Sequence, residues 1–237
     1  MMESPLAASL PAYPPVSPPV SLSAHGLACE RGDRLLFQHL SFTLCRAQLL
    51  LVQGGNGQGK TSLLRLLTGL GRPDAGEVRW TGEPIDRCRD RYHRDMAHLG
   101  HTNGIKDELT PLENLRFHGV LRNRPLVHGQ AVATLKRLGL SRCLDLPCRA
   151  LSFGQRRRVA LAALLLGGAS LWVLDEPLTG LDVNAIALVE GLIREHLNAG
   201  GMVVATTHQA MNLEGVDVQR LTVGPVGTAP ARSLESH

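Results

Sequence analysis

Two separate segments of the chain carry residue types that bind phosphate groups. Residues 54–61 satisfy the pattern GxxxxGK[ST] directly after an apolar stretch, and residues 151–155 read Leu-Ser-Phe-Gly-Gln before a strongly helical stretch. Glycines let backbone N–H groups approach phosphates without a Cβ clash, and a helix N-terminus adds partial positive charge. The nucleotide-binding residues expected in the first segment are Gly54, Gly55, Asn56, Gly57, Gln58, Gly59, Lys60, Thr61 and Ser62.

The end of the first segment assigns two chemical roles. Lys60 is expected to contact the β- and γ-phosphates of ATP, and the Thr61 hydroxyl is expected to ligate Mg²⁺. A glycine-rich turn with an incidental lysine is the alternative. The apolar run before this segment and the helical pattern after it favour the nucleotide site.

A pair of carboxylates follows a second apolar stretch. Residues 171–174 are continuously apolar and lead into Asp175 and Glu176. Asp175 is expected to hold Mg²⁺, and Glu176 to orient or deprotonate the attacking water. Acidic strand ends that serve only solvation are common, but the pairing with the phosphate-binding segment favours catalysis. His208 follows the strand-like run 202–206, where its imidazole could bridge the γ-phosphate and Glu176.

The second phosphate-binding segment predicts a site shared between two chains. Ser152, Gly154 and Gln155 begin a helix whose hydroxyl and N–H groups form an anion site. Because the chain already has its own phosphate-binding loop, we expect these residues to face the nucleotide of a second copy in a homodimer. The following Arg156, Arg157 and Arg158 are expected to solvate the helix start and pair with local carboxylates rather than to bind nucleic acid.

Strand-like and helix-like runs alternate, which predicts an α/β fold with a mainly parallel sheet. Strands are expected at 35–37, 41–44, 49–52, 76–80, 171–174 and 202–206, and helices at 60–67, 112–121, 131–138, from 152 onward and at 184–198. There is no internal repeat, which indicates that the chain is one subunit of a symmetric assembly rather than two subunits fused in one chain.

Composition limits the classes of function. The 237 residues carry a formal net charge of +4 and 3% aromatic residues, which is a poor supply of stacking platforms for nucleic acid. The five cysteines contain no CxxC pair and favour buried thiols in a reducing compartment, with a redox pair of Cys143 and Cys148 as the alternative. Neither a signal-peptide pattern nor a comfortable membrane span is visible, so membrane association is expected through partners.

Three regions are expected along the chain. Residues 1–22 are rich in proline and predicted to be a disordered extension, residues 23–225 form the ATPase domain, and residues 226–237 form a flexible tail.

Together these residues resemble the nucleotide-binding subunit of ATP-binding-cassette (ABC) transporters over roughly 23–223. The resemblance implies a P-loop NTPase core with an antiparallel β subdomain and a helical subdomain at about 87–160. Residues 54–61 resemble Walker A, 151–155 the signature, Asp175 Walker B and Glu176 the catalytic base. Asp182 resembles the D-loop aspartate and His208 the switch histidine. Implied cofactors are ATP and Mg²⁺.

A narrower resemblance is to the ATPase subunit of the cytochrome c maturation (haem exporter) complex. It is carried by residues 61–70, 72–78, 99–101, 104–106, 112–115, 172–177 and 206–209. It implies a peripheral subunit on the cytoplasmic face of a bacterial inner membrane. There it would pair with integral membrane permease subunits and use ATP hydrolysis to energise haem export or handling.

The chain departs from the family pattern at two places. Thr102 stands where the family usually has the Q-loop glutamine, which puts a Mg²⁺ contact and the coupling to a membrane partner in doubt. Residues 29–33 offer no aromatic ring for the adenine base. The scattered histidines of the middle region are expected to be solvated rather than to ligate haem; they are His93, His98, His101 and His118.

Other functions remain open on these patterns. The chain could be a soluble ABC ATPase that acts on nucleic acid or ribosomes, although such proteins usually fuse two cassettes or insert a coiled coil. It could instead serve an ABC exporter for another substrate. A P-loop kinase or GTPase is disfavoured by residues 151–155 and by the lack of an NKxD motif.

Overall fold

The computed structural model describes residues 20–224 and 231–233. Its strands are β1 (Ser21–Arg31), β2 (Arg34–Cys45), β3 (Gln48–Gln53), β4 (Ala75–Trp80), β5 (Glu83–Pro84), β6 (Met96–Leu99), β7 (Leu171–Leu174), β8 (Met202–Thr206), β9 (Asp217–Thr222) and β10 (Ala231–Ser233). Its helices are α1 (Lys60–Leu67), α2 (Arg89–Asp95), α3 (Pro111–Leu121), α4 (His128–Arg137), the 3₁₀ turn η1 (Cys148–Ala150), α5 (Phe153–Gly167) and α6 (Val183–Asn198).

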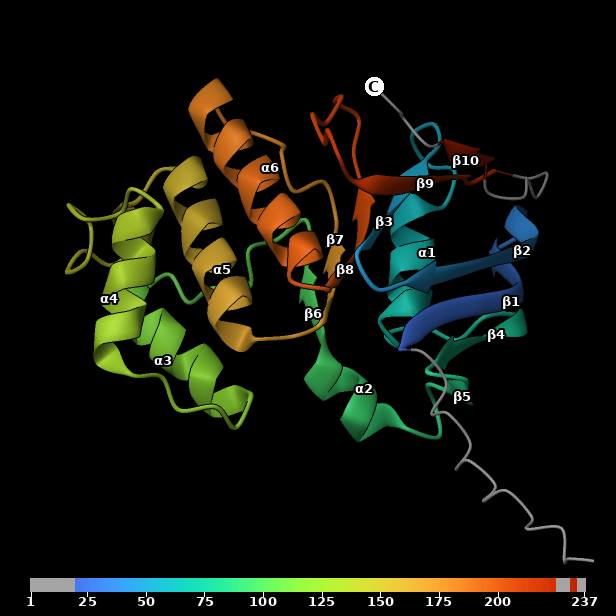
Figure 1. Cartoon of the computed structure of the whole chain (residues 1–237), viewed down its shortest axis with the longest axis horizontal. Coiled ribbons are helices and arrows are strands. Elements are labelled where there is room, and N and C mark those ends of the chain that lie inside the picture. Colours follow the sequence, from blue (N-terminus) through green and yellow to red (C-terminus); the bar gives the residue numbers. More distant parts are fainter. Residues whose placement is uncertain (1–19, 225–230, 234–237) are drawn as a thin grey trace, which may run out of the picture.

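Within the described ranges the strands form two sheets (Figure 1). A six-stranded sheet has the order β10-β9-β3-β8-β7-β6, in which every pair from β9 to β6 is parallel and β10 is antiparallel to β9. A four-stranded antiparallel sheet has the order β2-β1-β4-β5. The expected α/β class, the mainly parallel sheet and the antiparallel β subdomain are confirmed.

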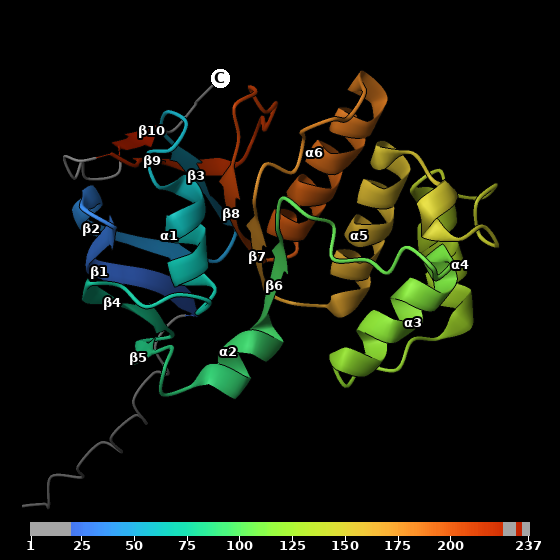
Figure 2. The same cartoon turned by 180° about the vertical axis from the view of Figure 1, so that it is seen from behind.

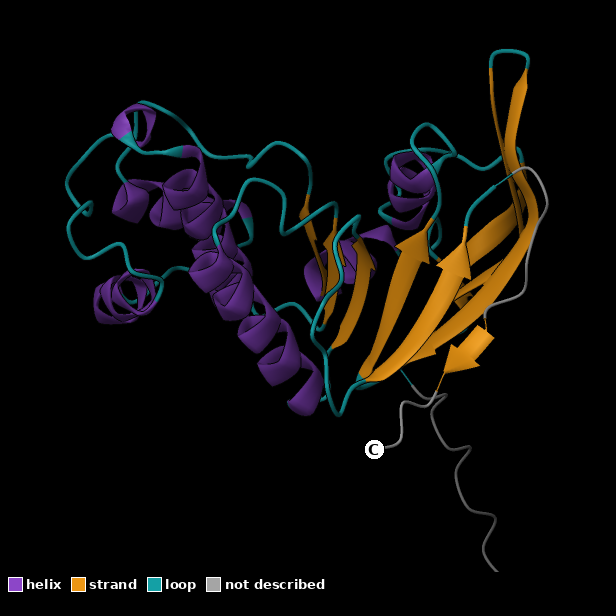
Figure 3. Cartoon of the chain, turned by 90° about the horizontal axis from the view of Figure 1, so that it is seen from above, coloured by secondary structure: helices purple, strands orange, loops and turns teal. Residues whose placement is uncertain are grey.

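The six-stranded sheet is covered on both faces, which explains why its central strands are continuously apolar. Leu49 and Leu51 of β3 belong to a core shared with α3, α4, α5 and α6. Leu50 and Val52 point the other way, into a core shared with α1 and the antiparallel sheet. Viewed from behind, α1 lies between the two sheets (Figure 2). Seen from above, α3, α4, α5 and α6 gather at one end of the molecule (Figure 3).

The parallel strands place their carboxyl ends together. Leu51 of β3 pairs with Ala205 of β8, and Leu174 of β7 pairs with the same Ala205. The residues that follow β3, β7 and β8 therefore meet at one edge of the sheet. In open α/β sheets this edge is the usual place for ligands.

Some predicted boundaries differ from the structure. The helical part expected from about residue 87 includes β6, which pairs with β7 and belongs to the parallel sheet. β10 lies inside the range 226–237 predicted to be a flexible tail. The rest of that range, apart from residues 231–233, and the proline-rich residues 1–19 lie outside the described residues.

Among the residues that the structure describes, no helix has the length and apolar character to cross a membrane. The five cysteines are free, and all but Cys45 are buried.

Candidate functional site

The phosphate-binding segment forms the loop between β3 and α1. Gly54 has φ 149° and Gly59 has φ 104°, and a Cβ on Gly54 would lie 2.6 Å from the carbonyl oxygen of Val223. Larger residues therefore do not fit this backbone path. Lys60 is the first residue of α1, and its Nζ donates to the carbonyl oxygens of Gly54 at 2.8 Å and Gly55 at 3.2 Å. The loop curls around the ammonium group.

The acidic pair follows β7 and is held by two threonine hydroxyls. Thr61 Oγ1 donates to Asp175 Oδ2 at 3.2 Å, and Thr206 Oγ1 donates to Asp175 Oδ1 at 2.8 Å. Asp175 is buried, so these bonds compensate much of its lost hydration. Thr61 and Asp175 come from elements far apart in sequence, and their contact brings the two predicted Mg²⁺ ligands together.

The side chains of Glu176 and His208 are in contact at the same edge. His208 Nε2 lies 2.9 Å from Glu176 Oε1, and Thr179 Oγ1 donates to Glu176 Oε2 at 3.1 Å. Both side chains remain open to solvent, with relative exposures of 25% for Glu176 and 45% for His208. A carboxylate that is oriented by its neighbours and still reachable by water can serve as a general base.

One cavity of about 420 Å³ joins these elements. Its lining comes from the phosphate-binding loop, the start of α1, the second residue of the acidic pair, the segment after β8 and the β1–β2 hairpin. The residues are Arg31, Arg34, Leu36, Asn56, Gly57, Gly59, Lys60, Thr61, Ser62, Glu176 and His208. The hairpin contributes Arg31 and Arg34 where an aromatic ring was sought in the sequence. A guanidinium plane can also stack on a base.

The signature segment lies apart from this cavity. Ser152 caps α5: its Oγ accepts from the N–H of Gln155 at 3.2 Å, and Gln155 Oε1 accepts from the N–H of Ser152 at 2.8 Å. The Gln155 amide also donates to Cys143 Sγ at 3.4 Å. Because both ends of the Gln155 amide bond within their own chain, this side chain is less available to a nucleotide than Ser152 and Gly154.

A short loop connects the acidic pair with α6. Asp182 caps α6 through a bond from the N–H of Ala185 to Oδ1 at 2.8 Å. Gly180 has φ 73°, and a Cβ there would lie 2.8 Å from the ring of Phe153. The signature segment and the loop containing Asp182 thus pack against each other, and Phe153 and Val183 are exposed beside them.

The structure corrects the prediction for one of the three arginines of α5 and bears it out for another. Arg156 does pair with a carboxylate, 3.6 Å from Asp107. Arg157 does not solvate the helix start, because it is 2% exposed and donates to backbone carbonyls near Asp175. Burial lowers the pKa of Arg157 to about 10, although the charge of Asp175 opposes the shift. Sequence reasoning missed the roles of Arg157 and Thr206, because it placed Arg157 in solvent and used Thr206 only within the runs 202–206 and 206–209.

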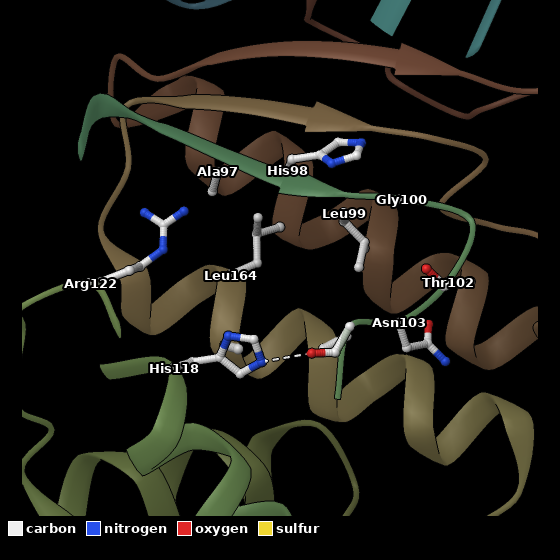
Figure 4. A pocket seen from close by; sticks show the side chains of 12 residues that line it. Ala97, His98, Leu99, Gly100, Thr102, Asn103, His118, Arg122 and Leu164 are labelled. Carbon is white, nitrogen blue, oxygen red and sulfur yellow. Dashed lines mark hydrogen bonds between the residues drawn. The ribbon is translucent and has the colours of Figure 1, made fainter. Parts of the chain in front are cut away.

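A second cavity, of about 250 Å³, lies between β6, α3 and α5 (Figure 4). Thr102 lines it from the loop after β6. From α3, His118 Nε2 donates to the carbonyl oxygen of Gly104 at 3.1 Å. Burial lowers the pKa of His98 and of His118. Within the described ranges no three His, Cys, Asp or Glu side chains gather as a metal site.

The sequence of this chain is similar to those of known proteins. A family described as "ABC transporter" matches residues 37–179. The cytochrome c biogenesis ATP-binding export protein CcmA of Methylococcus capsulatus is 52% identical over 82% of this chain and 94% of its own length. The protein with the same name from Nitrosospira multiformis is 49% identical over 85% and 98%, and that from Escherichia coli K12 is 46% identical over 85% and 96%.

Solved structures show the same fold at low identity. The ATP-binding subunit of an ABC transporter superposes with a TM-score of 0.77 at 22% identity, covering 89% of each chain. A nucleotide-free ATP-binding cassette superposes with a TM-score of 0.76 at 21% identity, covering 91% of this chain and 92% of the other.

Proposed function

Because the chain belongs to the ABC transporter family and to its cytochrome c biogenesis ATP-binding export proteins, we propose that it energises haem export or handling during cytochrome c biogenesis. It would do so as the ATP-hydrolysing subunit of a membrane transporter complex. One observation carries the hydrolytic part of the proposal: Lys60, Thr61, Glu176 and His208 line a single cavity.

Each side chain has a role in this proposal. Lys60 would turn from the carbonyls of Gly54 and Gly55 toward the β- and γ-phosphates, where its charge stabilises the transferring phosphoryl group. Glu176 would accept a proton from the attacking water, and His208 would hold the Glu176 carboxylate in place and contact the γ-phosphate.

The residues present fit a magnesium ion. Thr61 and Asp175 supply a hydroxyl and a carboxylate that already touch, and Mg²⁺ prefers such oxygen ligands together with substrate phosphates. When bound, the ion would neutralise charge that develops on the phosphates. Thr206 would keep Asp175 oriented toward it.

The signature residues Ser152 and Gly154 are assigned to a second copy's nucleotide, because they do not line the cavity of their own chain. A homodimer would close around two ATP molecules, and hydrolysis would remove the γ-phosphates that hold it closed. Asp182 would lie near the same interface, on the loop that contacts Phe153. Integral membrane permease subunits would place the dimer on the cytoplasmic face of the inner membrane.

Co-purification tests the transporter assignment. The tagged chain should be isolated from detergent-solubilised membranes of a bacterium that makes c-type cytochromes, and the bound polypeptides identified. Integral membrane proteins at a fixed ratio to the chain are expected. Ribosomal proteins or nucleic acid in their place would favour a soluble ABC ATPase and overturn the proposal.

Complementation then tests the substrate. Cells that lack the corresponding gene should regain cytochromes with covalently attached haem, detected by haem staining of a denaturing gel, when they receive the unchanged chain. The Lys60→Ala chain should not restore cytochrome maturation, because loss of the lysine charge lowers the rate of phosphoryl transfer by about 100-fold or more. Full cytochrome maturation with Lys60→Ala would contradict a role for ATP hydrolysis by this chain.

A further inference from the structure

Arg157 joins three segments that lie far apart in the sequence. It lies on α5, two residues after the signature glutamine. Its Nη1 donates to the carbonyl of Gly100 at 2.8 Å and to Asn103 Oδ1 at 3.1 Å. Its Nη2 donates to the carbonyls of Asp175 and Glu176, both at 3.1 Å. The guanidinium fork therefore connects the signature helix, the loop after β6 and the end of β7.

Such a buried arginine is costly unless its donors are matched. The side chain is 2% exposed, and its Nε has no hydrogen-bond partner in the described part of the chain. Nη2 donates to both of the consecutive carbonyls after β7, and Nη1 donates to the loop after β6. The rigid, planar guanidinium therefore serves two groups of acceptors at once, which a single lysine ammonium cannot reproduce. The arrangement therefore specifies a position for the backbone at Asp175 and Glu176.

That backbone position is strained. Glu176 has φ 48°, a left-handed conformation that non-glycine residues adopt only when the surroundings fix it. Arg157 holds the carbonyls of Asp175 and Glu176, and Thr206 Oγ1 accepts from the Glu176 N–H at 2.9 Å. These contacts orient the carboxylate that touches His208.

We propose that Arg157 is a positioning residue that fixes the Glu176 carboxylate for water activation and ties it to the loop at Gly100 and Asn103. The proposal rests on the proposed role of Glu176. The same loop includes Thr102 and lines the cavity between β6, α3 and α5 (Figure 4). Because Thr102 lacks the amide of a glutamine, the Asn103–Arg157 bond offers this loop another route to the catalytic carboxylate.

A double-mutant cycle separates positioning from general support. Single-turnover ATP hydrolysis should be measured with the full chain, Arg157→Lys, Glu176→Gln and the double variant. Misplacement of a catalytic group costs about 10- to 100-fold, so Arg157→Lys should lower the rate by that factor. In the Glu176→Gln background it should lower the rate by less than about twofold, because the group it positions is already gone. Equal factors in both backgrounds would overturn the proposal.

Nucleotide binding is the second readout. The dissociation constant of a fluorescent ATP analogue should stay within about threefold in Arg157→Lys, since a positioning role affects the chemical step rather than ground-state binding. Loss of binding together with hydrolysis would make Arg157 a general structural residue and overturn the proposal. Arg156→Lys, a change at the neighbouring half-buried arginine, is the matched control and should keep the unchanged rate.

A milder variant covers the loop connection. Asn103→Ala removes one of the four bonds to Arg157, and we expect a smaller loss of rate that also disappears in the Glu176→Gln background. An Asn103→Ala rate equal to that of the unchanged chain would overturn the loop connection. If Glu176→Gln itself hydrolyses ATP normally, the proposed function of Glu176 fails with the inference. A slow Glu176→Gln beside a normal Arg157→Lys would reject the inference alone.

Discussion

The hydroxyl of Thr206 donates a hydrogen bond to the carboxylate of Asp175 at 2.8 Å, across the neighbouring ends of β8 and β7. The same oxygen accepts the N–H of Glu176 at 2.9 Å. Thr206 is fully buried and Asp175 nearly so. One hydroxyl thus holds both the carboxylate assigned to Mg²⁺ and the backbone of the residue assigned to water activation.

Thr206→Val should therefore damage both stability and turnover. The change keeps the side-chain volume but leaves the Glu176 N–H and one oxygen of Asp175 without this partner. Leaving buried polar groups unpaired costs about 1–3 kcal/mol, so the free energy of unfolding in urea should fall by that amount. Hydrolysis should fall as well. Thr43→Val, an exposed threonine on β2, is the control and should change neither quantity.

The sequence predicted the part of the site that depends on local patterns. The glycines and Lys60 follow the fixed spacing of a phosphate-binding loop, and Asp175 directly follows an apolar strand. Parallel strands bring their carboxyl ends to one edge of the sheet, so these residues were expected to meet there. Arg157 and Thr206 could not be predicted in this way. They act through backbone carbonyls, a backbone N–H and a carboxylate on other elements, and those partners are defined only by the tertiary packing.

The fold shows the same division. The continuously apolar strands were recognised, whereas β1, β6 and β9 were missed. β6 has four residues and includes His98, and β9 carries Asp217, Gln219 and Arg220 near the edge of the sheet. β6 pairs with β7 and β9 pairs with β3, and this pairing stabilises both as strands although their own composition does not indicate a strand.

Glu176→Gln should trap an ATP-bound dimer. The amide keeps the size of the side chain but cannot accept a proton from water, and loss of a general base typically slows a reaction by about 100- to 10,000-fold. Sizing chromatography with ATP and Mg²⁺ should move the variant to the dimer position. Lys60→Ala should remain a monomer under the same conditions. A Glu176→Gln chain that also stays monomeric would count against the shared nucleotide site.

Gly180→Ala should disturb the contact between the signature segment and the loop before α6. Gly180 has a φ of 73°, which is unfavourable for alanine, and a Cβ there would lie 2.8 Å from the ring of Phe153. Gly82 has a similar φ of 81° but nothing within 4 Å, so Gly82→Ala measures the backbone cost alone, about 1–2 kcal/mol.

The two alanine variants should therefore differ in activity. Gly82→Ala should lower only the free energy of unfolding, whereas Gly180→Ala should also lower ATP hydrolysis. Adding Phe153→Ala to Gly180→Ala should recover part of the lost stability, because the clash disappears. Identical unfolding curves and rates for the two single variants would show that the Phe153 contact has no consequence.

Acid should weaken the fold through a half-buried histidine on α6. The ring of His196 on α6 stacks on Trp172 of β7, with centroids 3.9 Å apart and planes 7° apart. Burial lowers the pKa of His196 from its ordinary 6.5, against backbone hydrogen bonds at Ser170 and Met202. The unfolded chain then binds a proton more readily than the folded one, so stability falls as the pH drops below about 6.5 and is unaffected by this group well above it.

His196→Gln tests this direction, because a flat amide can lie on Trp172 without titrating. The variant should lose less unfolding free energy between pH 7.5 and pH 5 than the unchanged chain does, as measured by urea titration at each pH. His98 and His118, whose pKa values are also lowered by burial, continue to titrate and leave a residual slope. His101→Gln, a change at an exposed histidine, is the control. A His196→Gln slope equal to that of the unchanged chain would mean that the stacked ring is protonated as easily in the folded state as in the unfolded one.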